Sequence, residues 1–575
     1  MPQYQQKGQT MVSSEVRLSG GVPTLFIDGR PVPGMAYITY FRADARYRQF
    51  ADAGYRLFSI PVYFGDQGIN AVYGIRPFEP GIFSEKGKAD FSILDRQIGQ
   101  ILEIVPDAYI FPRVNMSMPS WWERDNPDEC CDTGVGGGPR RSCFASDKWF
   151  DDTWEMLERF LRYAESAPYA DRICAYMLAD GNTEEWFAFD QRGGIGPAAR
   201  RKNGGKGDPD DPAFRRFLSH TAADAICRFA RKTKELTQHR KAVGCFYGYT
   251  FEVPTWKMNH HALREVLASP DVDFLCSPAS YVARREPGLD WPWQVPFDSM
   301  QAAGKLYFME NDTRTHLTKL LKDCHPGACP EHTYEQPVWL GPDSEAKSIH
   351  LLRMNLARQL ASAHASWWFD MWGGWFDSPA IMREMAEYLK IAERFLRDPE
   401  RTLPAECALW IDETAFAHAD PEQENQLSKL SRIRVGQCGV PFDIYEIGDF
   451  PERGTRYKAN VFVVHAETPA VTGAVEICRA KGIPVLIMRP GAVPTSDELR
   501  DFCTRAGAHC FNSTGDAVFY GPHFAAIHAA SDGNKEICLP RRFRVSPLLD
   551  PGTPSETDRI RVEMRIGETK LFRLD

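Results

Sequence analysis

The segment KLYFMENDTRTHL (residues 305–317) changes character abruptly at its centre. Its apolar run LYFM is followed by polar residues that include Glu310, Asp312 and Arg314. A strand bounded in this way runs from a buried sheet into a loop at the carboxyl edge of that sheet. Two carboxylates and an arginine at such an edge have two explanations: an ion-paired cap that ends the strand, or an active site.

The alternation of a short apolar strand with a helix recurs through the first 400 or so residues. One of the predicted helices, DKWFDDTWEMLERFLRYAES, begins at Asp147, which is well placed as an N-cap. Repeated βα units predict an α/β fold of the (β/α)8 TIM-barrel type over residues 1–400, with its site on the loops that follow the strand ends. The predicted strands are RPVPGMAYI, YRLFSIPV, AYIFPRVNM, RICAYMLADG, KAVGCFYGY, VDFLCSPASY, KLYFMEN and ASWWFDMW.

The pattern changes after about residue 400. The segments AECALWIDE, FDIYEIGD, KANVFVVHAE and IPVLIMRP are strands separated by helices, which predicts a flavodoxin-like α/β domain over residues 401–525. No Gly-rich phosphate loop follows its first strand, so we expect no nucleotide or flavin cofactor. Residues 526–575 alternate like antiparallel strands with a turn at Gly567, which predicts a small β-domain without catalytic duty.

Composition limits the possible partners. The net charge is −9, with 43% hydrophobic and 25% charged residues. An acidic surface of this kind disfavours nucleic acid or an anionic membrane as the main partner. No stretch approaches about 20 uninterrupted apolar residues, and the first residues contain no apolar signal segment. The 15 cysteines are odd in number and scattered, which suits a reducing compartment, and we expect a cytoplasmic protein.

Two cysteine-rich segments leave a zinc site as an alternative to simple loop thiols. Neither has the paired C-x2-C spacing that is typical of a zinc site, so no metal is predicted. The first contains Cys130, Cys131 and Cys143, and the second contains Cys324, His325, Cys329 and His332.

Polar and aromatic residues follow most of the predicted barrel strands, and a barrel would bring them to one face. Carboxylates beside tryptophans and tyrosines suit glycoside hydrolysis, in which one carboxylic acid protonates the leaving oxygen and one carboxylate attacks or activates water. The fourth and seventh strands lie on opposite sides of such a barrel, so carboxylates at their ends can flank a sugar. The residues at the strand ends are Arg113, Asn115, Asp180, Asn182, Glu184, Glu185, Tyr247, Tyr249, Glu252, Ser280, Tyr281, Arg284, Glu310, Asp312, Arg314, Trp367, Trp368 and Asp370.

The segments PTLFIDGRPVPGMAYITY and YADRICAYMLADGNTEEWF resemble family 42 β-galactosidases and their near relatives in clan A of the glycoside hydrolases. The resemblance implies a retaining double displacement, with Glu185 as acid/base after the fourth strand and Glu310 as nucleophile after the seventh. It also implies a β-glycosidase, with β-galactosidase ahead of β-mannosidase and other β-glycosidases. A pocket closed by the loop over residues 315–344 would favour exo-action on a terminal sugar. A tryptophan after the eighth strand forms the platform under the sugar in such barrels, which selects Trp368. The α/β domain would mediate a homotrimer.

The acid/base position departs from the family pattern. Family 42 has Asn immediately before the acid/base, and Glu184 stands there in this chain. Adjacent residues leaving a strand point in opposite directions, so only one of Glu184 and Glu185 can face the mouth. The Glu that directly precedes Trp186 carries the role in similar sequences, which favours Glu185. Asn182 could take over the contact with the sugar 2-hydroxyl.

The other candidate substrate-binding residues have structural alternatives. Tyr281 and Arg314 could donate to Glu310, while Arg314 and Asp312 could instead form a local ion pair. Glu252 could contact a sugar hydroxyl or end its strand in solvent. We also assign Arg113 and Tyr247 to the substrate. The long loop over residues 315–344 is expected to wall the cleft. A metal-dependent barrel hydrolase and a non-catalytic sugar-binding protein remain the competing functions.

Overall fold

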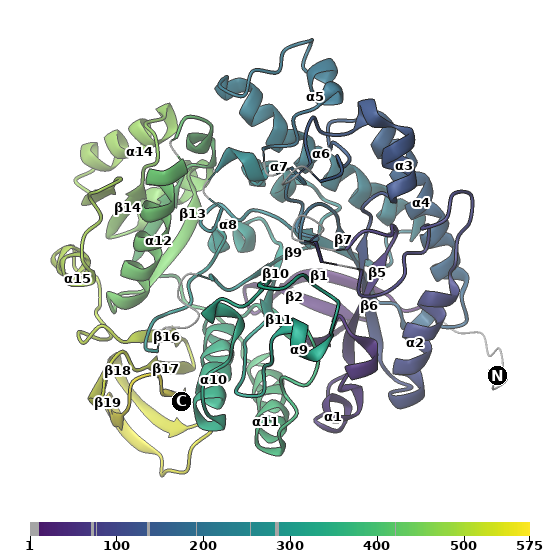
Figure 1. The fold of residues 1–575 in the computed structure, drawn as a ribbon. Helices are drawn as coiled ribbons and strands as arrows, with labels where there is room; N and C mark the ends of the chain where they lie inside the picture. Colours follow the sequence, from purple (N-terminus) through teal and green to yellow (C-terminus); the bar gives the residue numbers. More distant parts are fainter. Residues whose placement is uncertain are drawn as a thin grey trace.

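The computed structural model describes residues 11–68, 70, 74–75, 77–134, 138–190, 192–253, 255–281, 287–419 and 421–575. Its parts lie side by side in Figure 1: the barrel of the first 400 residues, the α/β domain and the C-terminal sheet. Among the described residues, no helix is long and apolar enough to cross a membrane.

Eight parallel strands close into a barrel, as the sequence predicts. The strands follow one another around the barrel in chain order, and the last of them, β11, pairs with the first, β4. Each predicted barrel strand overlaps one strand of the observed barrel, so the (β/α)8 architecture is confirmed. The strands are β4 (Met35–Ile38), β5 (Leu57–Tyr63), β6 (Tyr109–Asn115), β7 (Ala175–Ala179), β8 (Ala242–Phe246), β9 (Phe274–Pro278), β10 (Leu306–Asn311) and β11 (Ala365–Phe369).

Helices connect successive strands and surround the barrel (Figure 1). The helix predicted to begin with Asp147 as its cap is capped instead by Ser146, whose hydroxyl accepts a hydrogen bond from the Trp149 amide at 2.9 Å. Asp147 is the first helical residue, where its charge still favours the helix N-terminus. The principal helices are α1 (Tyr47–Asp52), α2 (Ser92–Ile104), α4 (Asp147–Ser166), α6 (Pro212–Leu236), α7 (Leu263–Ala268), α8 (Phe297–Ala302), α10 (Glu345–Ser362) and α11 (Pro379–Phe395).

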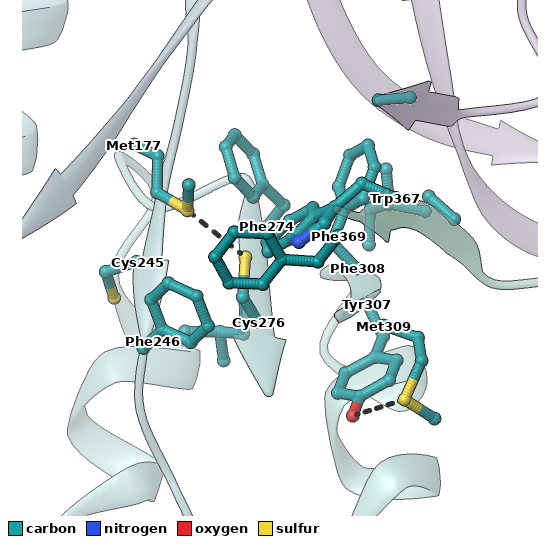
Figure 2. Packing of buried hydrophobic residues seen from close by; sticks show 14 of the residues in the cluster. Met177, Cys245, Phe246, Phe274, Cys276, Tyr307, Phe308, Met309, Trp367 and Phe369 are labelled. Atoms are coloured by element: carbon teal, nitrogen blue, oxygen red, sulfur yellow. Dashed lines mark hydrogen bonds between the residues drawn. The ribbon is translucent and has the colours of Figure 1, made fainter. Parts of the chain in front are cut away.

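Large apolar side chains fill the barrel interior. Figure 2 shows Trp367 beside Phe308, and it shows Met177 of β7 in contact with Cys276 of β9. The Trp367 ring lies 5.4 Å from that of Phe308 and 5.9 Å from that of Phe246. Among the described residues the barrel interior is therefore a packed core, which leaves the mouth as the place for a site in a fold of this type.

An N-terminal antiparallel sheet, which was not predicted from the sequence, lies at the opposite end of the barrel. It consists of β1 (Ser14–Ser19), β2 (Val22–Ile27) and β3 (Arg30–Pro31). The Ser14 amide donates to the Arg240 carbonyl at 2.8 Å, just before β8 begins. This sheet covers the amino ends of the strands and leaves the carboxyl ends open for a site.

The second domain is a parallel sheet in the order β13-β12-β14-β15, which confirms the predicted flavodoxin-like topology. Helix α8 of the barrel packs against its edge: the Ile444 amide donates to Asp298 at 2.6 Å, and the Glu446 amide donates to Ser299 at 2.8 Å. Its elements are β12 (Cys407–Ile411), α12 (Pro421–Gln437), β13 (Phe442–Glu446), β14 (Ala459–Val463), α14 (Pro469–Ala480), β15 (Val485–Met488) and α15 (Ser496–Arg505).

The chain ends in an antiparallel sheet in the order β16-β17-β20-β18-β19. It begins at Ala517, ahead of the predicted boundary at 526, because a hairpin of β16 and β17 joins it. Gly567, with φ of 81°, lies in the connection between β19 and β20 as predicted. The strand bounds are β16 (Ala517–Gly521), β17 (Phe524–His528), β18 (Gly533–Pro547), β19 (Ser555–Met564) and β20 (Thr569–Leu574).

Candidate active site

Side-chain alternation along β10 brings Glu310 to the barrel mouth. Phe308 packs against Trp367 inside the barrel, so Glu310, two residues later, faces the same axis at the carboxyl end. Met309 and Tyr307 face outward toward the helices, as Figure 2 shows for their contact. Glu310 is 4% exposed. Strand β10 therefore delivers a buried carboxylate to the end of a filled barrel.

Arg113 joins two of the predicted carboxylates. Its Nε lies 2.6 Å from Oε2 of Glu184, and its Nη1 lies 3.2 Å from Oε2 of Glu310. Burial by itself lowers the pKa of Arg113, but the neighbouring charges, that of Glu184 above all, hold the pKa well above its ordinary value. Arg113 is thus a fixed positive charge beside Glu310, a position consistent with keeping that carboxylate ionised.

The segment that carries Glu184 and Glu185 has an unusual backbone. Thr183, Glu184 and Trp186 all have φ near +60°, a region that residues other than glycine rarely adopt. The turn is held by the Trp186 amide, which donates to the Asp180 carbonyl at 2.7 Å, and by the Trp186 indole, which donates to the Leu178 carbonyl at 3.0 Å. Strain of this kind concentrates at functional sites, where the surrounding structure must maintain it.

Glu184 is enclosed by polar partners. The side chain is fully buried and receives hydrogen bonds from the Asn115 amide and the Tyr40 hydroxyl, both at 3.3 Å, in addition to Arg113. Burial raises its pKa, while Arg113 and these hydrogen bonds oppose the rise. With both oxygens engaged and no exposed surface, this carboxylate is suited to holding Arg113 in place.

Glu185 has different surroundings. It is partly exposed, and its Oε1 accepts a hydrogen bond from the Tyr249 hydroxyl at 2.8 Å, while Thr183 donates to its Oε2. Burial raises its pKa, with hydrogen bonds from Thr183 and Tyr249 opposing and the charge of Asp312 adding to the rise. Among the described residues Glu185 makes no ion pair. A carboxyl group with a raised pKa and access to the mouth can serve as a general acid.

His260 contacts the backbone of both Glu185 and Tyr249. Its Nε2 lies 2.7 Å from the Glu185 carbonyl, and its Nδ1 accepts from the Tyr249 amide at 3.3 Å. Burial lowers the pKa of His260 to about 3, so the ring is neutral and donates through Nε2. His260 was not among the residues selected from the sequence, and Tyr249 was noted only as a strand-end residue. Alternation from Tyr247 would not have selected Tyr249, because both lie beyond the end of β8 and Gly248, with φ of 89°, turns the chain between them.

Asp312, Arg314 and Tyr281 form a second polar group at the mouth. Arg314 pairs with Asp312 at 2.7 Å, and the Tyr281 hydroxyl donates to Asp312 at 3.1 Å. The local ion pair that the sequence left open is thus present, and Arg314 and Tyr281 converge on Asp312. The loop over 315–344 reaches this group through Trp339, whose ring lies 4.6 Å from the Arg314 guanidinium. Arg284 lies outside the described residues.

Two predicted substrate contacts face away from the mouth. The Trp368 indole donates to the Tyr55 hydroxyl at 2.9 Å and packs against Tyr388 of α11, in the layer between strands and helices. The Tyr247 hydroxyl donates to the Asn259 carbonyl at 2.8 Å in the same outer layer. Neither side chain reaches the mouth, because each lies on the outward-facing side of its strand. Trp367, the inward-facing neighbour, lies in the packed interior below the mouth.

Glu252 and Asn182 have mainly structural contacts. Glu252 accepts hydrogen bonds from the Ser280 hydroxyl and the Tyr281 amide and pairs with Arg432 of α12 at 2.9 Å. It therefore links the second domain to the backbone beside Tyr281 instead of ending in solvent. The Asn182 amide donates to the Phe187 carbonyl at 3.0 Å, and its buried Oδ1 has no hydrogen-bond partner among the described residues.

The cysteine-rich segments are part of the packing. Cys131 and Cys143 lie in a small buried cluster with Trp256 and Phe214. His325 stacks on Phe41 with ring centroids 3.4 Å apart. Within the described part of the chain, no group of three or more His, Cys, Asp or Glu residues could hold a metal ion.

Comparison with known proteins identifies relatives by structure. No protein-family model and no curated protein sequence matches the chain. The β-galactosidase from Rahnella sp. R3 superposes with a TM-score of 0.59 at 11% identity, over 94% of this chain and 98% of that one. The β-galactosidase from Bacillus circulans sp. alkalophilus superposes with a TM-score of 0.57 at 12% identity, over 94% of this chain and 98% of that one. The exo-carrageenase GH42 from Bacteroides ovatus superposes with a TM-score of 0.59 at 12% identity, over 98% of this chain and 84% of that one.

These matches cover the barrel, the α/β domain and the C-terminal sheet together. The predicted resemblance to family 42 and its clan is therefore confirmed at the level of the fold. At such low identity, the chemistry of this chain has to be argued from its own residues.

Proposed function

We propose that this protein is a retaining, exo-acting β-glycosidase, and that a terminal β-linked galactose is its most favoured sugar. The observation that carries the proposal is the unequal pair of carboxyl groups at the barrel mouth. Glu310 lies against the Arg113 guanidinium, whereas Glu185 has only neutral hydrogen-bond donors among its described contacts and has a raised pKa. Two carboxyl groups in different environments provide a nucleophile and a proton donor.

In the first step, the Glu310 carboxylate attacks the anomeric carbon while the Glu185 carboxyl group protonates the glycosidic oxygen. The bond between the anomeric carbon and that oxygen breaks, and a glycosyl ester of Glu310 remains. In the second step, the Glu185 carboxylate removes a proton from water as the water oxygen attacks the anomeric carbon. The ester bond breaks, which regenerates both residues and retains the anomeric configuration.

Other residues maintain this arrangement. Arg113 stabilises the ionised form of Glu310, and Glu184 fixes Arg113 from its other side. Tyr249 and His260 orient the side chain and the backbone of Glu185. The β-galactosidases among the structural relatives support the choice of sugar, and the resemblance supports a homotrimer that forms through the α/β domain.

A panel of nitrophenyl β-glycosides tests the proposal on wild type, Glu185→Ala and Glu310→Ala. We expect one sugar to be cleaved, no turnover by Glu310→Ala, and a loss of roughly 10²–10⁴-fold in Glu185→Ala. Azide should partly rescue Glu185→Ala by attacking the glycosyl ester without base assistance. Glu393→Ala, an exposed glutamate of α11, is the matched control and should retain full activity. Full activity in Glu310→Ala would contradict the proposal, and cleavage of no glycoside by wild type would favour a sugar-binding protein.

A further inference from the structure

The buried side chain of Arg314 uses only part of its hydrogen-bonding capacity within the protein. Its Nη1 donates to the Asp312 carboxylate at 2.7 Å and to the Asp312 carbonyl at 2.8 Å. Its Nε and Nη2 are buried and have no acceptor among the described residues. The side chain is only 3% exposed. A buried donor without an acceptor has lost its hydration and gained no compensating hydrogen bond.

Aromatic rings surround this guanidinium. Its central carbon lies 4.6 Å from the ring of Trp339, 5.4 Å from that of Trp375 and 5.9 Å from that of Tyr281. The indole nitrogen of Trp375 is also buried without an acceptor among the described residues. Two donor nitrogens of Arg314 and one of Trp375 thus lie in neighbouring side chains without an acceptor among the described residues.

The unmatched groups are all donors, and this restricts the chemistry of a ligand. Nε and Nη2 form one planar edge of the guanidinium, and two oxygens of a carboxylate or a sulfate can accept both hydrogen bonds at once. Such an oxyanion brings acceptors only. A neutral hydroxyl group would bring one oxygen and a proton that needs an acceptor of its own, so it would match fewer of these donors than an oxyanion does.

We propose that Arg314 and Trp375 form a subsite for an oxyanion substituent of the sugar, a sulfate ester or a carboxylate. This inference rests on the proposed glycosidase function and narrows its substrate to an acidic sugar. The subsite lies at the same mouth as the proposed catalytic residues, because Arg314 pairs with Asp312, whose charge acts on Glu185. Since the charges of Asp312 and Arg314 cancel, recognition depends on short-range hydrogen bonds rather than long-range attraction.

Isothermal titration calorimetry on the full chain with Glu310→Gln tests the subsite without turnover. The probes are D-galactose, D-galactose 6-sulfate, D-galacturonic acid and inorganic sulfate. We expect at least one of the acidic sugars to bind about tenfold or more tightly than D-galactose, and sulfate to compete with it. Equal affinity for the neutral and acidic sugars, or binding of no anionic probe, would overturn the proposal.

Two variants, each combined with Glu310→Gln, assign the effect to the proposed donors. Arg314→Lys keeps the charge but removes the planar edge, and Trp375→Phe keeps a ring but removes the N–H donor. Both variants should abolish or reduce the preference for the anion, and a thermal melt should show that each is folded. If Arg314→Lys does not fold, Trp375→Phe alone tests the subsite. Arg505→Lys, at an exposed arginine of α15, is the control and should change nothing. An anion preference that survives both substitutions would also overturn the proposal.

The experiments distinguish an error in the subsite from an error in the proposed catalysis. If neutral β-glycosides are hydrolysed and no anion binds through Arg314, only the subsite is wrong. If anions bind through Arg314 but no glycoside, acidic or neutral, is hydrolysed, the subsite stands and the proposed catalysis is wrong.

Discussion

Glu184 and Glu185 are neighbours in the chain, yet their surroundings suit them to opposite tasks. Glu184 is buried against Arg113, and Glu185 contacts the hydroxyl groups of Tyr249 and Thr183. The sequence could narrow the acid/base to these two residues, because both follow the fourth barrel strand. It could not predict the left-handed backbone at Thr183 and Glu184, which decides the direction of each side chain. Local strain of this kind is maintained by tertiary contacts that no short motif records.

The hydrogen bond from Tyr249 predicts how the pH profile responds to mutation. This bond stabilises the ionised form of Glu185 and lowers its pKa against the raising effect of burial. Tyr249→Phe removes it, so the pKa of Glu185 should rise further. Because the general acid must be protonated, the alkaline limb of kcat/KM should move to higher pH. The profile of kcat/KM against pH measures this, and a limb that moves to lower pH would contradict the role of Glu185.

At the scale of elements, strand alternation explains which predicted residues reach the mouth. Glu310 and Arg113 lie on inward-facing positions of β10 and β6, whereas Trp368 and Tyr247 lie on outward-facing positions. Apolar runs in the sequence predicted where the strands lie. A strand that is buried on both faces is apolar throughout, so its sequence does not reveal which residues face the barrel interior. The choice of Trp368 over Trp367 therefore could not be tested before the packing was known.

Trp368 should contribute to stability and not to catalysis. Trp368→Phe removes the hydrogen bond to Tyr55 and part of the buried ring, which should lower the free energy of unfolding by roughly 1–3 kcal/mol. The kcat/KM of the folded protein should stay within about twofold of wild type, since surrounding packing is largely kept. Chemical denaturation and steady-state kinetics measure the two effects. Tyr55→Phe removes the same bond together with the one that the Tyr55 hydroxyl donates to the Met385 carbonyl, so its loss of stability should be at least as large. A large fall in kcat/KM without loss of stability would restore Trp368 as a sugar platform.

At the scale of the whole molecule, buried carboxyl groups join the barrel to the α/β domain. Glu413 accepts from the Leu263 amide at 2.6 Å at the start of α7, and Glu446 pairs with Arg264 of the same helix at 3.2 Å. Burial raises the pKa of both glutamates, and nearby carboxylates add to the rise, Glu446 for Glu413 and Asp412 for Glu446. The order of domains was predictable from the βα pattern. These contacts were not, because they join residues more than a hundred positions apart.

The raised pKa values predict that this junction weakens as the pH rises. The folded protein holds protons on Glu413 and Glu446 at a pH where the unfolded chain has released them. Their contribution to stability is therefore fully present below the unfolded pKa and is lost as the pH rises through the folded values. Glu446→Gln should reduce the fall in Tm between about pH 5 and about pH 8 relative to wild type. Thermal melts across this range measure the fall in Tm, with Glu393→Gln as control. An unchanged or steeper fall in Glu446→Gln would contradict the raised pKa of Glu446.

We propose that Glu310 attacks the anomeric carbon of a β-linked sugar. The most direct test is to inactivate the protein with the 2-deoxy-2-fluoro β-glycoside of the sugar that it cleaves, and to locate the label by peptide mass spectrometry. We expect one covalently attached sugar, carried by Glu310, and no label in Glu310→Gln. A label on Glu184 or Glu185, or hydrolysis that inverts the anomeric configuration and leaves no label, would contradict it.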